Sequence, residues 1–515
     1  MDYCTVGRIS EPPGCDARDL LPVLSCANLS YFPFAMESYD FVVIGGGSAG
    51  YSAAVTAAHL GLKTICVEGA EELGGLCILR GCMPSKTFIE SANRFLTLRR
   101  AEEFGLSAGH LGFDAAAIIR RKRKLIGGFA EYRAQQLNSG LFRLARGHAA
   151  FSDPFHVKVS FRDGREERIE GKTFLISTGS VLNTVEVPGL DKVGFLHSDL
   201  ALDTERWPRS VIVLGGGAIA LEFAHFYNAF GSAVTILQRS GRIMKEADRD
   251  IASALADAFQ NRGIKIVCGT KLKAAELSDS GKLVRYEKDG VEHVLEADEI
   301  FFALGRKPAV EGVGLGEAGV SLGRGETVAV NAMMQTSQPH IFASGDVTGL
   351  HEIVHIAIEQ GEIAARNAKN LLDGKALQAI DYRLKLFAMF SEPQLAMVGL
   401  TEREAEEQGI AVRVAKYPFL DHGKAMVRGE VEGFVKLIVE ARSGEILGAV
   451  VVGPEASELI HEIVVAMHFH ATAGELSTIP HYHPTLSEIW TYPAEELAAV
   501  RSGVASNATP APAAQ

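Results

Sequence analysis

Asp40-Phe41-Val42-Val43-Ile44-Gly45-Gly46-Gly47-Ser48-Ala49-Gly50 is the stretch that decides the fold of the chain's first part. Its first five residues predict a buried β-strand, and the Ala-rich residues that follow, to about Leu60, predict a helix. A second short strand is expected at residues 64–67, before Glu68. The spacing of Gly45, Gly47 and Gly50 is typical of a turn that brings backbone close to a pyrophosphate at a helix N-terminus. The stretch therefore predicts a dinucleotide-binding βαβ unit.

The same pattern occurs again at residues 211–238. An apolar strand leads into the turn positions Gly215, Gly217 and Ala220, and a helix and a second strand follow. In both copies the glycine turn lies between a strand and a helix at the same offset along the chain. A single glycine motif is weak evidence for nucleotide binding. Two motifs that each lie between a strand and a helix are specific evidence, so we expect two dinucleotide-binding units.

In each unit a residue at the end of the second strand faces the expected ribose, and this residue is charged in the first unit and neutral in the second. Glu68 is placed to accept a hydrogen bond from a ribose 2′-hydroxyl. The second copy has Gln238 at this position and Arg239 beside it, so no carboxylate repels a 2′-phosphate and a guanidinium is available to bind one. We expect the second site to accept or prefer NADP(H), the alternative being that these residues form only a solvated surface turn.

Composition places the chain among ordinary globular proteins. Its 515 residues suggest about three or four domains, and 47% hydrophobic and 22% charged residues are enough for several cores. The formal net charge of −12 argues against a nucleic-acid partner, which would require basic surfaces. No apolar run reaches the about 20 residues of a membrane span, so no membrane partner is expected.

The two ends of the chain differ from the rest. Residues 1–35 contain three of the seven cysteines but neither a periodic pattern nor the apolar core of a secretory signal. We predict a poorly ordered leader over residues 1–37, or an upstream start added to a chain that begins at Met36. Residues 501–515 are predicted to be a disordered tail. The low cysteine content favours a cytoplasmic location.

Two cysteines, Cys77 and Cys82, follow the first unit directly. In a regular helix residues five apart lie about 8–9 Å apart at Cα, whereas a disulfide needs about 4.4–6.8 Å. Pairing therefore requires a local distortion, which Gly81 permits. An iron–sulfur cluster would want a further cysteine where Ser85 stands, a zinc site would need two more ligands, and two unrelated buried thiols are the third alternative. We favour a redox-active disulfide facing a bound flavin and predict no metal site.

Taken in order, these motifs resemble those of the class I pyridine nucleotide-disulfide oxidoreductases, which include dihydrolipoyl dehydrogenase, glutathione reductase and mercuric reductase. The resemblance extends from about Tyr39 to about Tyr492. Beyond the glycine turns and the cysteines, it is carried by Pro84-Ser85-Lys86, Ile176-Ser177-Thr178-Gly179-Ser180, Leu304-Gly305-Arg306-Lys307-Pro308, Ile341-Phe342-Ala343-Ser344-Gly345-Asp346-Val347 and His481-Tyr482-His483-Pro484-Thr485-Leu486-Ser487-Glu488.

The resemblance implies an α/β fold with two Rossmann-like dinucleotide-binding domains, the second inserted in the first, and a C-terminal α+β dimerisation domain. The expected segments are an FAD-binding domain at residues 38–186 and 306–383, an NAD(P)-binding domain at 187–305 and the dimerisation domain at 384–500. The implied cofactors are FAD and NADP or NAD. The implied assembly is a homodimer whose active site is shared between subunits.

The resemblance also implies roles for individual residues. Cys82 is expected next to the flavin, and Cys77 is expected to exchange with the substrate sulfur. Lys86, paired with Glu222, is expected at the reactive edge of the flavin, where a cation stabilises the negative charge of the reduced ring. The other residues expected to contact cofactor are Ala149, Thr178, Gly179, Gly305, Asp346, which would bind the ribityl chain, and His355.

The C-terminal motif supplies a candidate base. A histidine oriented by a carboxylate is suited to take a thiol proton near neutral pH. His483 is therefore predicted to move the proton and Glu488 to hold the imidazole. In the family this pair reaches the disulfide of the other subunit.

The expected activity is electron transfer between NAD(P)(H) and a small-molecule or lipoyl-type disulfide or dithiol, most like that of dihydrolipoyl dehydrogenase. Arg80, between the cysteines, would favour thiolate and attract an acidic substrate. Gln238 departs from the acidic residue usual in NAD-dependent relatives. The alternatives are NADPH-dependent reduction of another disulfide or of mercuric ion, and a flavin-loaded regulatory or structural component with little turnover.

Overall fold

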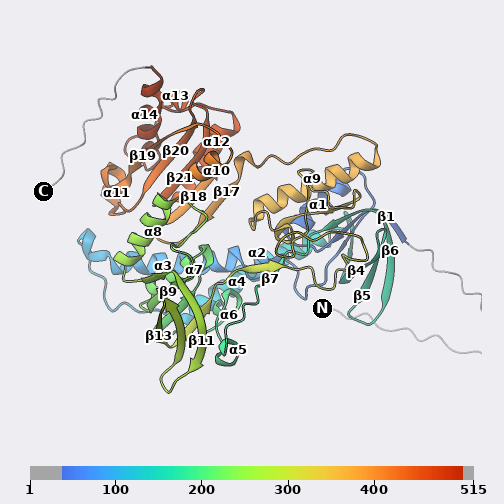
Figure 1. The fold of residues 1–515 in the computed structure, drawn as a ribbon, viewed down its shortest axis with the longest axis horizontal. Coiled ribbons are helices and arrows are strands. Elements are labelled where there is room, and N and C mark those ends of the chain that lie inside the picture. The colour runs from blue at the N-terminus through green and yellow to red at the C-terminus, as the bar shows by residue number, and fades with distance from the viewer. Residues whose placement is uncertain (1–36, 503–515) are drawn as a thin grey trace, which may run out of the picture. The chain divides into compact units, whose positions relative to one another are not determined.

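The computed structural model describes residues 37–502 of the chain. Of the expected leader at 1–37, residues 1–36 lie outside the described residues, and Glu37 is the first residue of β1 (Glu37–Ile44). Of the expected tail at 501–515, residues 503–515 lie outside them, and residues 501–502 end helix α14 (Thr491–Ser502). Figure 1 shows the strands gathered into separate sheets, with helices between and around them.

The first sheet contains seven strands in the order β3-β2-β1-β6-β5-β4, with β16 paired to β6. Strands β2, β1, β6 and β16 run parallel, as βαβ crossovers require, whereas β5 and β4 add antiparallel strands. Strand β16 joins this sheet from far later in the chain, after the second glycine motif. The strands are β1 (Glu37–Ile44), β2 (Thr64–Val67), β3 (Arg143–Ala145), β4 (Gly147–Asp153), β5 (His156–Phe161), β6 (Glu166–Ile176) and β16 (Ile341–Ala343).

The second parallel sheet has the order β10-β9-β8-β14 and is built around the second glycine motif. A three-stranded antiparallel sheet, β11-β12-β13, and a two-stranded one, β15-β7, accompany it. The strands are β7 (Ser180–Leu182), β8 (Ser210–Leu214), β9 (Ala233–Gln238), β10 (Lys265–Cys268), β11 (Thr270–Leu277), β12 (Lys282–Lys288), β13 (Val291–Ala297), β14 (Glu299–Phe302) and β15 (Arg306–Pro308).

The C-terminal part is an antiparallel sheet of five strands in the order β17-β18-β21-β20-β19. Its apolar core contains Trp490 and side chains of α12 (Ala456–His468) and α14 (Thr491–Ser502). The strands are β17 (Leu386–Met389), β18 (Gln394–Gly399), β19 (Val412–Pro418), β20 (Phe434–Glu440) and β21 (Ile446–Gly453). The expectation of an α/β fold with two dinucleotide-binding sheets and a C-terminal α+β part is confirmed.

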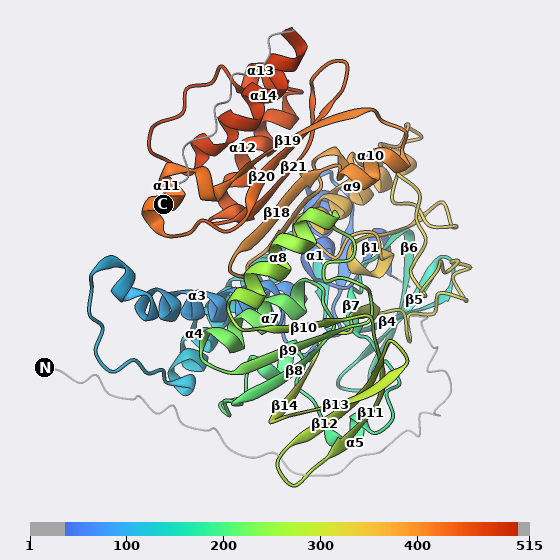
Figure 2. The ribbon, with the colours of Figure 1, turned by 60° about the vertical axis from the view of Figure 1, so that its left-hand side comes forward.

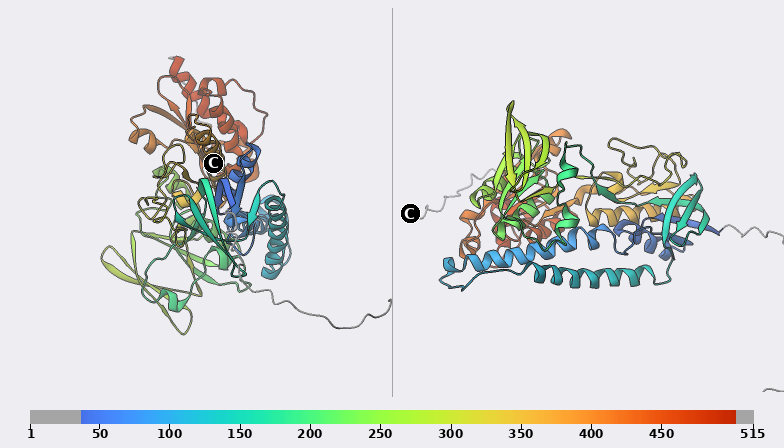
Figure 3. Two further views of the ribbon diagram at one scale, coloured as in Figure 1. Left: turned by 90° about the vertical axis from the view of Figure 1, so that its right-hand side faces the viewer. Right: turned by 90° about the horizontal axis from the view of Figure 1, so that it is seen from below.

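Two helix pairs position the segments that matter for function. Helix α1 (Ser48–His59) packs on α9 (Val354–Leu372) through small residues, and a Cβ on Gly361 would lie 2.3 Å from the Ala49 carbonyl oxygen. Helix α3 (Cys82–Arg99) runs beside α4 (Ala115–Leu137), as Figure 3 shows from below.

Helix α8 (Arg249–Asn261) lies between the second parallel sheet and the C-terminal sheet (Figure 2). Just past its C-terminus, Arg262 donates to the Glu392 carbonyl oxygen and forms an ion pair with Glu432. Among residues 37–502 no helix is long and apolar enough to cross a bilayer. The remaining α-helices are α2 (Gly75–Leu79), α5 (Leu190–Val193), α6 (Ser198–Ala201), α7 (Ala218–Ala229), α10 (Glu402–Glu407), α11 (Gly423–Arg428) and α13 (Ala473–Leu476), and the 3₁₀-helices are η1 (Ala101–Phe104), η2 (Gly345–Thr348), η3 (Tyr382–Leu384), η4 (Phe419–Asp421) and η5 (Ser487–Trp490).

Candidate active site

The first glycine turn joins β1 to α1 in a conformation that only glycine tolerates. Gly45 has φ of +100°, and a Cβ on Gly50 would lie 1.8 Å from the Gly45 carbonyl oxygen. The Glu68 carboxylate accepts hydrogen bonds from the backbone N–H groups of Gly46 at 2.8 Å and Ala70 at 2.7 Å. At Gly47, the N-cap of α1, a Cβ would meet nothing within 4 Å. The helix N-terminus therefore faces open space in which an anion is favoured.

A second set of predicted residues lies where β6 and β16 end. Asp346 accepts a hydrogen bond from the Ser180 hydroxyl at 2.6 Å. Among the described residues, the buried hydroxyl oxygens of Thr178 and Ser344 have no hydrogen-bond partner. Buried polar groups are normally hydrogen-bonded, so these two oxygens need a partner that residues 37–502 do not supply. Together with the open glycine turn they fit a polar, phosphate-bearing cofactor such as FAD.

The remaining residues predicted to bind FAD are spread around these two turns. Ala149 lies in β4, whose first residue, Gly147, donates to the Glu68 carbonyl oxygen at 3.0 Å. Gly179 has φ of +76°. His355, in the first turn of α9, has an exposed side chain. Neighbouring protein atoms that partly desolvate the ring, and the nearby His461, lower its pKa.

The second glycine turn repeats the first with a different end residue. Gly215 has φ of +112°, and at Gly217 a Cβ would meet nothing within 4 Å. Ala220 is buried in the first turn of α7. Gly305, whose φ is +98°, follows β14.

Gln238 cannot repeat the role of Glu68 as a charged acceptor. Its amide donates to the Ser240 hydroxyl at 3.1 Å and to the Arg242 carbonyl oxygen at 3.4 Å. Arg239 is exposed and forms no ion pair within the described residues, whereas Arg242 donates to the carbonyl oxygens of Lys245 and Ala247. Arg239 is therefore the cation at the end of β9 that is placed to bind an anion.

Cys77 and Cys82 lie on two separate helices. Helix α2 ends at Leu79 and α3 begins at Cys82, so the backbone leaves helical geometry at Arg80 and Gly81, as a close approach of the two sulfurs requires. Both side chains are half-buried free thiols in the structure and hydrogen-bond to each other.

The two thiols differ in acidity. The hydrogen bond from Cys77, aided by the Lys86 ammonium, lowers the pKa of Cys82 to about 7. The same hydrogen bond, with burial, raises the pKa of Cys77 above its usual range. Cys82 is also the first residue of α3, where the helix dipole favours an anion. Ionisation of the pair therefore begins at Cys82, which is about half thiolate at pH 7 and largely thiolate above it.

Lys86 links three parts of the chain at this point. It lies one helical turn after Cys82, and its Nζ is 2.9 Å from both carboxylate oxygens of Glu222 on α7. Glu222 is buried and also accepts a hydrogen bond from the Phe390 backbone N–H at 2.9 Å. The Lys86 ammonium lies 4.7 Å from the centroid of the Phe390 ring. The carboxylate of Glu222 and the ring of Phe390 thus fix the position of Lys86 beside the cysteines.

The C-terminal motif forms a hydrogen-bonded pair at the surface. His483 Nδ1 is 2.9 Å from the Glu488 carboxylate, and its side chain is 79% exposed. On the other side, Glu488 lies 3.5 Å from Nε2 of His422, which is fully buried and has no hydrogen-bond partner within the described residues. Burial lowers the pKa of His422, so it is neutral near pH 7. Sequence reasoning missed His422, which lies 66 positions before Glu488 and belongs to no motif.

The structure does not bring His483 to the cysteines of the same chain. Its only ion-pair partner in the described part is Glu488, and its ring faces outward. Arg80 is also exposed, with its guanidinium 3.5 Å from Glu72. The other histidine of the motif, His481, is bound to Glu462 at 2.7 Å.

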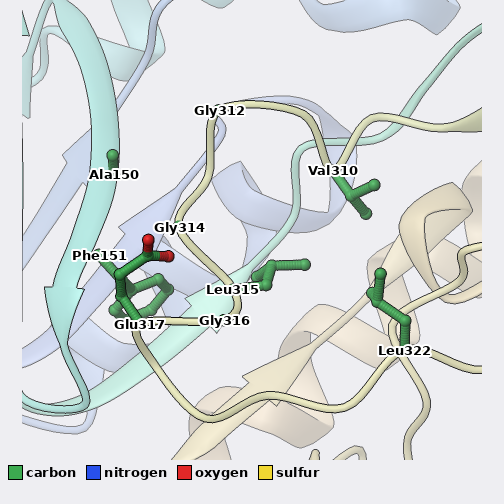
Figure 4. Close-up of a pocket in the computed structure, with 9 residues that line it drawn as sticks. All are labelled: Ala150, Phe151, Val310, Gly312, Gly314, Leu315, Gly316, Glu317 and Leu322. Atoms are coloured by element: carbon green, nitrogen blue, oxygen red, sulfur yellow. The ribbon is translucent and has the colours of Figure 1, made fainter.

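A carboxylate cluster and a surface pocket contain none of the predicted site residues. Asp248, Asp250 and Glu402 form a group of carboxylates that is close enough to hold a cation. The fully buried ammonium of Lys436, on β20, bonds to all three, at 2.8, 3.1 and 2.7 Å. A surface pocket beside β4 is lined by the glycine-rich loop at residues 310–322 and contains none of the predicted site residues (Figure 4).

Comparison with known proteins identifies the family to which this chain belongs. A model described as pyridine nucleotide-disulphide oxidoreductase matches residues 39–361, and one for the dimerisation domain of the same family matches residues 387–494. Dihydrolipoyl dehydrogenase from Mycobacterium leprae is 36% identical over 82% of this chain and 90% of its own length. The enzyme of the same name from Bacillus subtilis is 34% identical over 81% and 89%.

Solved structures agree with the sequence comparison. LpdA from Mycobacterium tuberculosis superposes with a TM-score of 0.80 and 28% identity, covering 90% of this chain and all of that one. The Cu(II) complex of RclA, an HOCl-induced flavoprotein disulfide reductase from Escherichia coli, gives a TM-score of 0.77 and 26% identity over 90% and 100% of the two chains.

The chain belongs to the pyridine nucleotide-disulfide oxidoreductase family. It is a flavoprotein disulfide oxidoreductase that uses FAD and NAD(P), which confirms the activity and cofactors expected from the sequence. It carries the family's dimerisation domain.

Proposed function

We propose that this enzyme transfers electrons between NADP(H) and a disulfide or dithiol, of which a lipoyl group is the leading candidate. The observation that carries this is the pair of unequal thiols, with the Cys82 pKa held at about 7 beside Lys86. The lipoyl assignment is supported by the relatives named dihydrolipoyl dehydrogenase. We further propose that the four segments expected from the sequence form the three domains of the enzyme, and that it acts in the cytoplasm.

The residues would divide the chemistry as follows. FAD, when bound, supplies the two-electron carrier between the nicotinamide and the cysteine pair. The turns at Gly45 and Gly179, with Asp346, Thr178 and Ser344, would bind it. Cys82 carries the thiolate and Lys86 keeps it ionised, while Cys77, protonated until a base acts, exchanges with the substrate sulfur.

We propose that His483 and Glu488 act on Cys77 of a second copy. His483 is too exposed to serve a buried site within its own chain, and the thiol of Cys77 needs a base. Four apolar side chains in this region are 52–83% exposed: Val465 on α12, Phe469 directly after it, and Ile479 and Tyr482 shortly before His483. Such a surface is what an obligate homodimer buries.

A complementation experiment tests the shared site. Cys77→Ser and His483→Gln are expected to be inactive as separate proteins, because each lacks one essential group. Refolded or co-expressed together, they should regain on the order of a quarter of the wild-type turnover, since mixed dimers contain one intact site. Mixtures that stay inactive while mixed dimers form would contradict a shared site.

The choice of nucleotide rests on Arg239. Its open guanidinium beside a neutral Gln238 suits the 2′-phosphate of NADP(H). Turnover of lipoamide, glutathione disulfide and 5,5′-dithiobis(2-nitrobenzoate) with NADPH and with NADH tests substrate and nucleotide together. Wild-type enzyme that reduces none of them with either nucleotide would contradict the proposed function.

A further inference from the structure

Arg133 lies on α4, which packs against α2, the helix that carries Cys77, and within the described residues it has no acidic partner. Its guanidinium stacks on the ring of Tyr51 from α1, with 4.0 Å between Cζ and the ring centroid. The groups that act on it electrostatically are Tyr51, Cys77 and Tyr132, and within residues 37–502 it forms no ion pair with a carboxylate. A cation is thus held on the helix that packs against the cysteine helix α2, within electrostatic range of Cys77.

The edge of this guanidinium is unsatisfied. Arg133 Nε is buried and has no hydrogen-bond partner in the described part of the chain, and the same is true of Oε1 of Gln136, one turn later on α4. Burial lowers the pKa of Arg133, which measures the cost of keeping an unpaired charge there. Because Tyr51 covers one face of the guanidinium, an anionic partner would have to bind in the plane of the group, where Nε lacks a hydrogen bond.

Other arginines of α4 show that an acidic partner is the usual arrangement on this helix. Arg120 forms an ion pair with Asp114, and Arg123 with Asp203. Arg80, the cation that the sequence singled out for an acidic substrate, is exposed and faces Glu72. Arg133 is therefore the cation near the cysteines that is positioned for a ligand.

We propose that Arg133 binds a carboxylate or similar anionic group of the disulfide substrate while the substrate sulfur reacts with Cys77. This proposal rests on the proposed function and refines its substrate: a lipoyl group in amide linkage is neutral, so Arg133 favours instead disulfides that carry a negative charge a few bonds from the sulfur. The free donor edge and the Tyr51 platform are the features that would recognise such a group.

The reaction at this position balances without a new reagent. The Cys77 thiolate, after losing its proton to the base, attacks one substrate sulfur, so that a mixed disulfide forms and the other half leaves as a thiolate that takes up a proton. The Cys82 thiolate then attacks the Cys77 sulfur, which forms the Cys77–Cys82 disulfide and releases the second half as a thiolate that takes a proton from water. NAD(P)H, through the established activity, returns two electrons to the pair.

Four small disulfides of matched length separate charge from other effects. 3,3′-Dithiodipropionate is anionic, its diamide and 2-hydroxyethyl disulfide are neutral, and cystamine is cationic. Wild-type kcat/KM is expected to be highest for the anion. Arg133→Gln should lower that value about tenfold or more, as loss of a hydrogen-bonded charge pair predicts. The neutral substrates should change less than about twofold, and Arg133→Glu should move the preference toward cystamine.

Two matched variants test whether the effect of Arg133→Gln arises from a change of structure and not from loss of the anion-binding group. Arg120→Gln makes the same substitution on the exposed face of the same helix and is expected to leave all four values unchanged. Arg133→Lys keeps the charge and should retain a preference for the anion. FAD content and Tm establish that each variant is folded.

Alkylation of the reduced enzyme gives a readout that needs no turnover. Iodoacetate is anionic and iodoacetamide neutral, and each loses iodide when the Cys77 sulfur bonds to its methylene carbon. The ratio of their rates at Cys77, followed by peptide mass spectrometry, should fall severalfold in Arg133→Gln. An unchanged ratio, or equal losses of kcat/KM on all four disulfides, would overturn the proposal. Failure of the proposed function would appear separately, as wild-type enzyme that turns over no disulfide.

Discussion

Lys86 and Glu222, 136 positions apart in the sequence, form a two-pronged ion pair in which the ammonium is 2.9 Å from each carboxylate oxygen. The pair joins the helix that begins at Cys82 to the helix that follows the second glycine turn. A single contact thereby sets the charge beside the thiolate and ties the cysteine helix to the nucleotide-binding sheet.

Removal of this cation should make Cys82 less acidic. The Lys86 ammonium lowers the pKa of Cys82, so Lys86→Met is expected to raise that pKa by about one unit. The long-wavelength absorbance of the two-electron-reduced enzyme, which reports the thiolate next to flavin, should then appear at higher pH. Arg94→Met, on the exposed side of the same helix, is the control and should not move the midpoint.

The end residue of β9 should decide between the two nucleotides. Gln238→Glu restores an acceptor like Glu68 and places a negative charge where the 2′-phosphate would bind. The ratio of kcat/KM for NADPH to that for NADH is expected to fall about 100-fold, or ~2.7 kcal/mol. Glu68→Gln, the matched change at the first turn, should weaken FAD binding and leave this ratio alone.

Acid should destabilise the fold through His225. This histidine is fully buried on α7, its Nε2 is 2.8 Å from the Asn93 side chain, and burial lowers its pKa to about 3. The unfolded chain binds the proton first, so the stabilising contribution is complete above the unfolded pKa of about 6.5 and is lost as pH falls from there toward 3.

Thermal unfolding between pH 7.5 and 4.5 measures this effect. His225→Gln should flatten the loss of stability, whose slope from one such histidine approaches 1.4 kcal/mol per pH unit, an order-of-magnitude figure. His59→Gln, an exposed histidine on α1, is the control. Identical pH profiles for wild type and His225→Gln would show that His225 is not the titrating group.

Lys436 should be among the most sensitive positions for stability. Lys436→Met leaves the carboxylates of Asp248, Asp250 and Glu402 without their cation, and loss of one partner of a buried ion pair costs about 3–5 kcal/mol. Chemical denaturation measures the change, with Lys265→Met, an exposed lysine of β10, as control. A loss below about 1 kcal/mol would mean that the cluster behaves as a surface pair.

Local signals explain what could be predicted from the sequence. The glycine turns could be predicted because the strand, turn and end residue of each lie within one short stretch, as do the two cysteines and Lys86. His422 and Arg133 could not, because their significance comes from partners brought near by tertiary packing: Glu488 for the first, Tyr51 and Cys77 for the second. The acidity difference between Cys77 and Cys82 likewise needed three-dimensional neighbours.

Helix α8 has a consequence for how nucleotide enters and leaves. Lys436 holds its N-terminal end and Arg262, with Glu432, its C-terminal end, both against the C-terminal sheet. A swinging motion of the nucleotide-binding sheet would have to separate both sets of charges at once. We therefore expect the pyridine nucleotide to exchange through side-chain motions while the nucleotide-binding sheet keeps its position. A hinge motion should then limit the rate of neither release nor uptake.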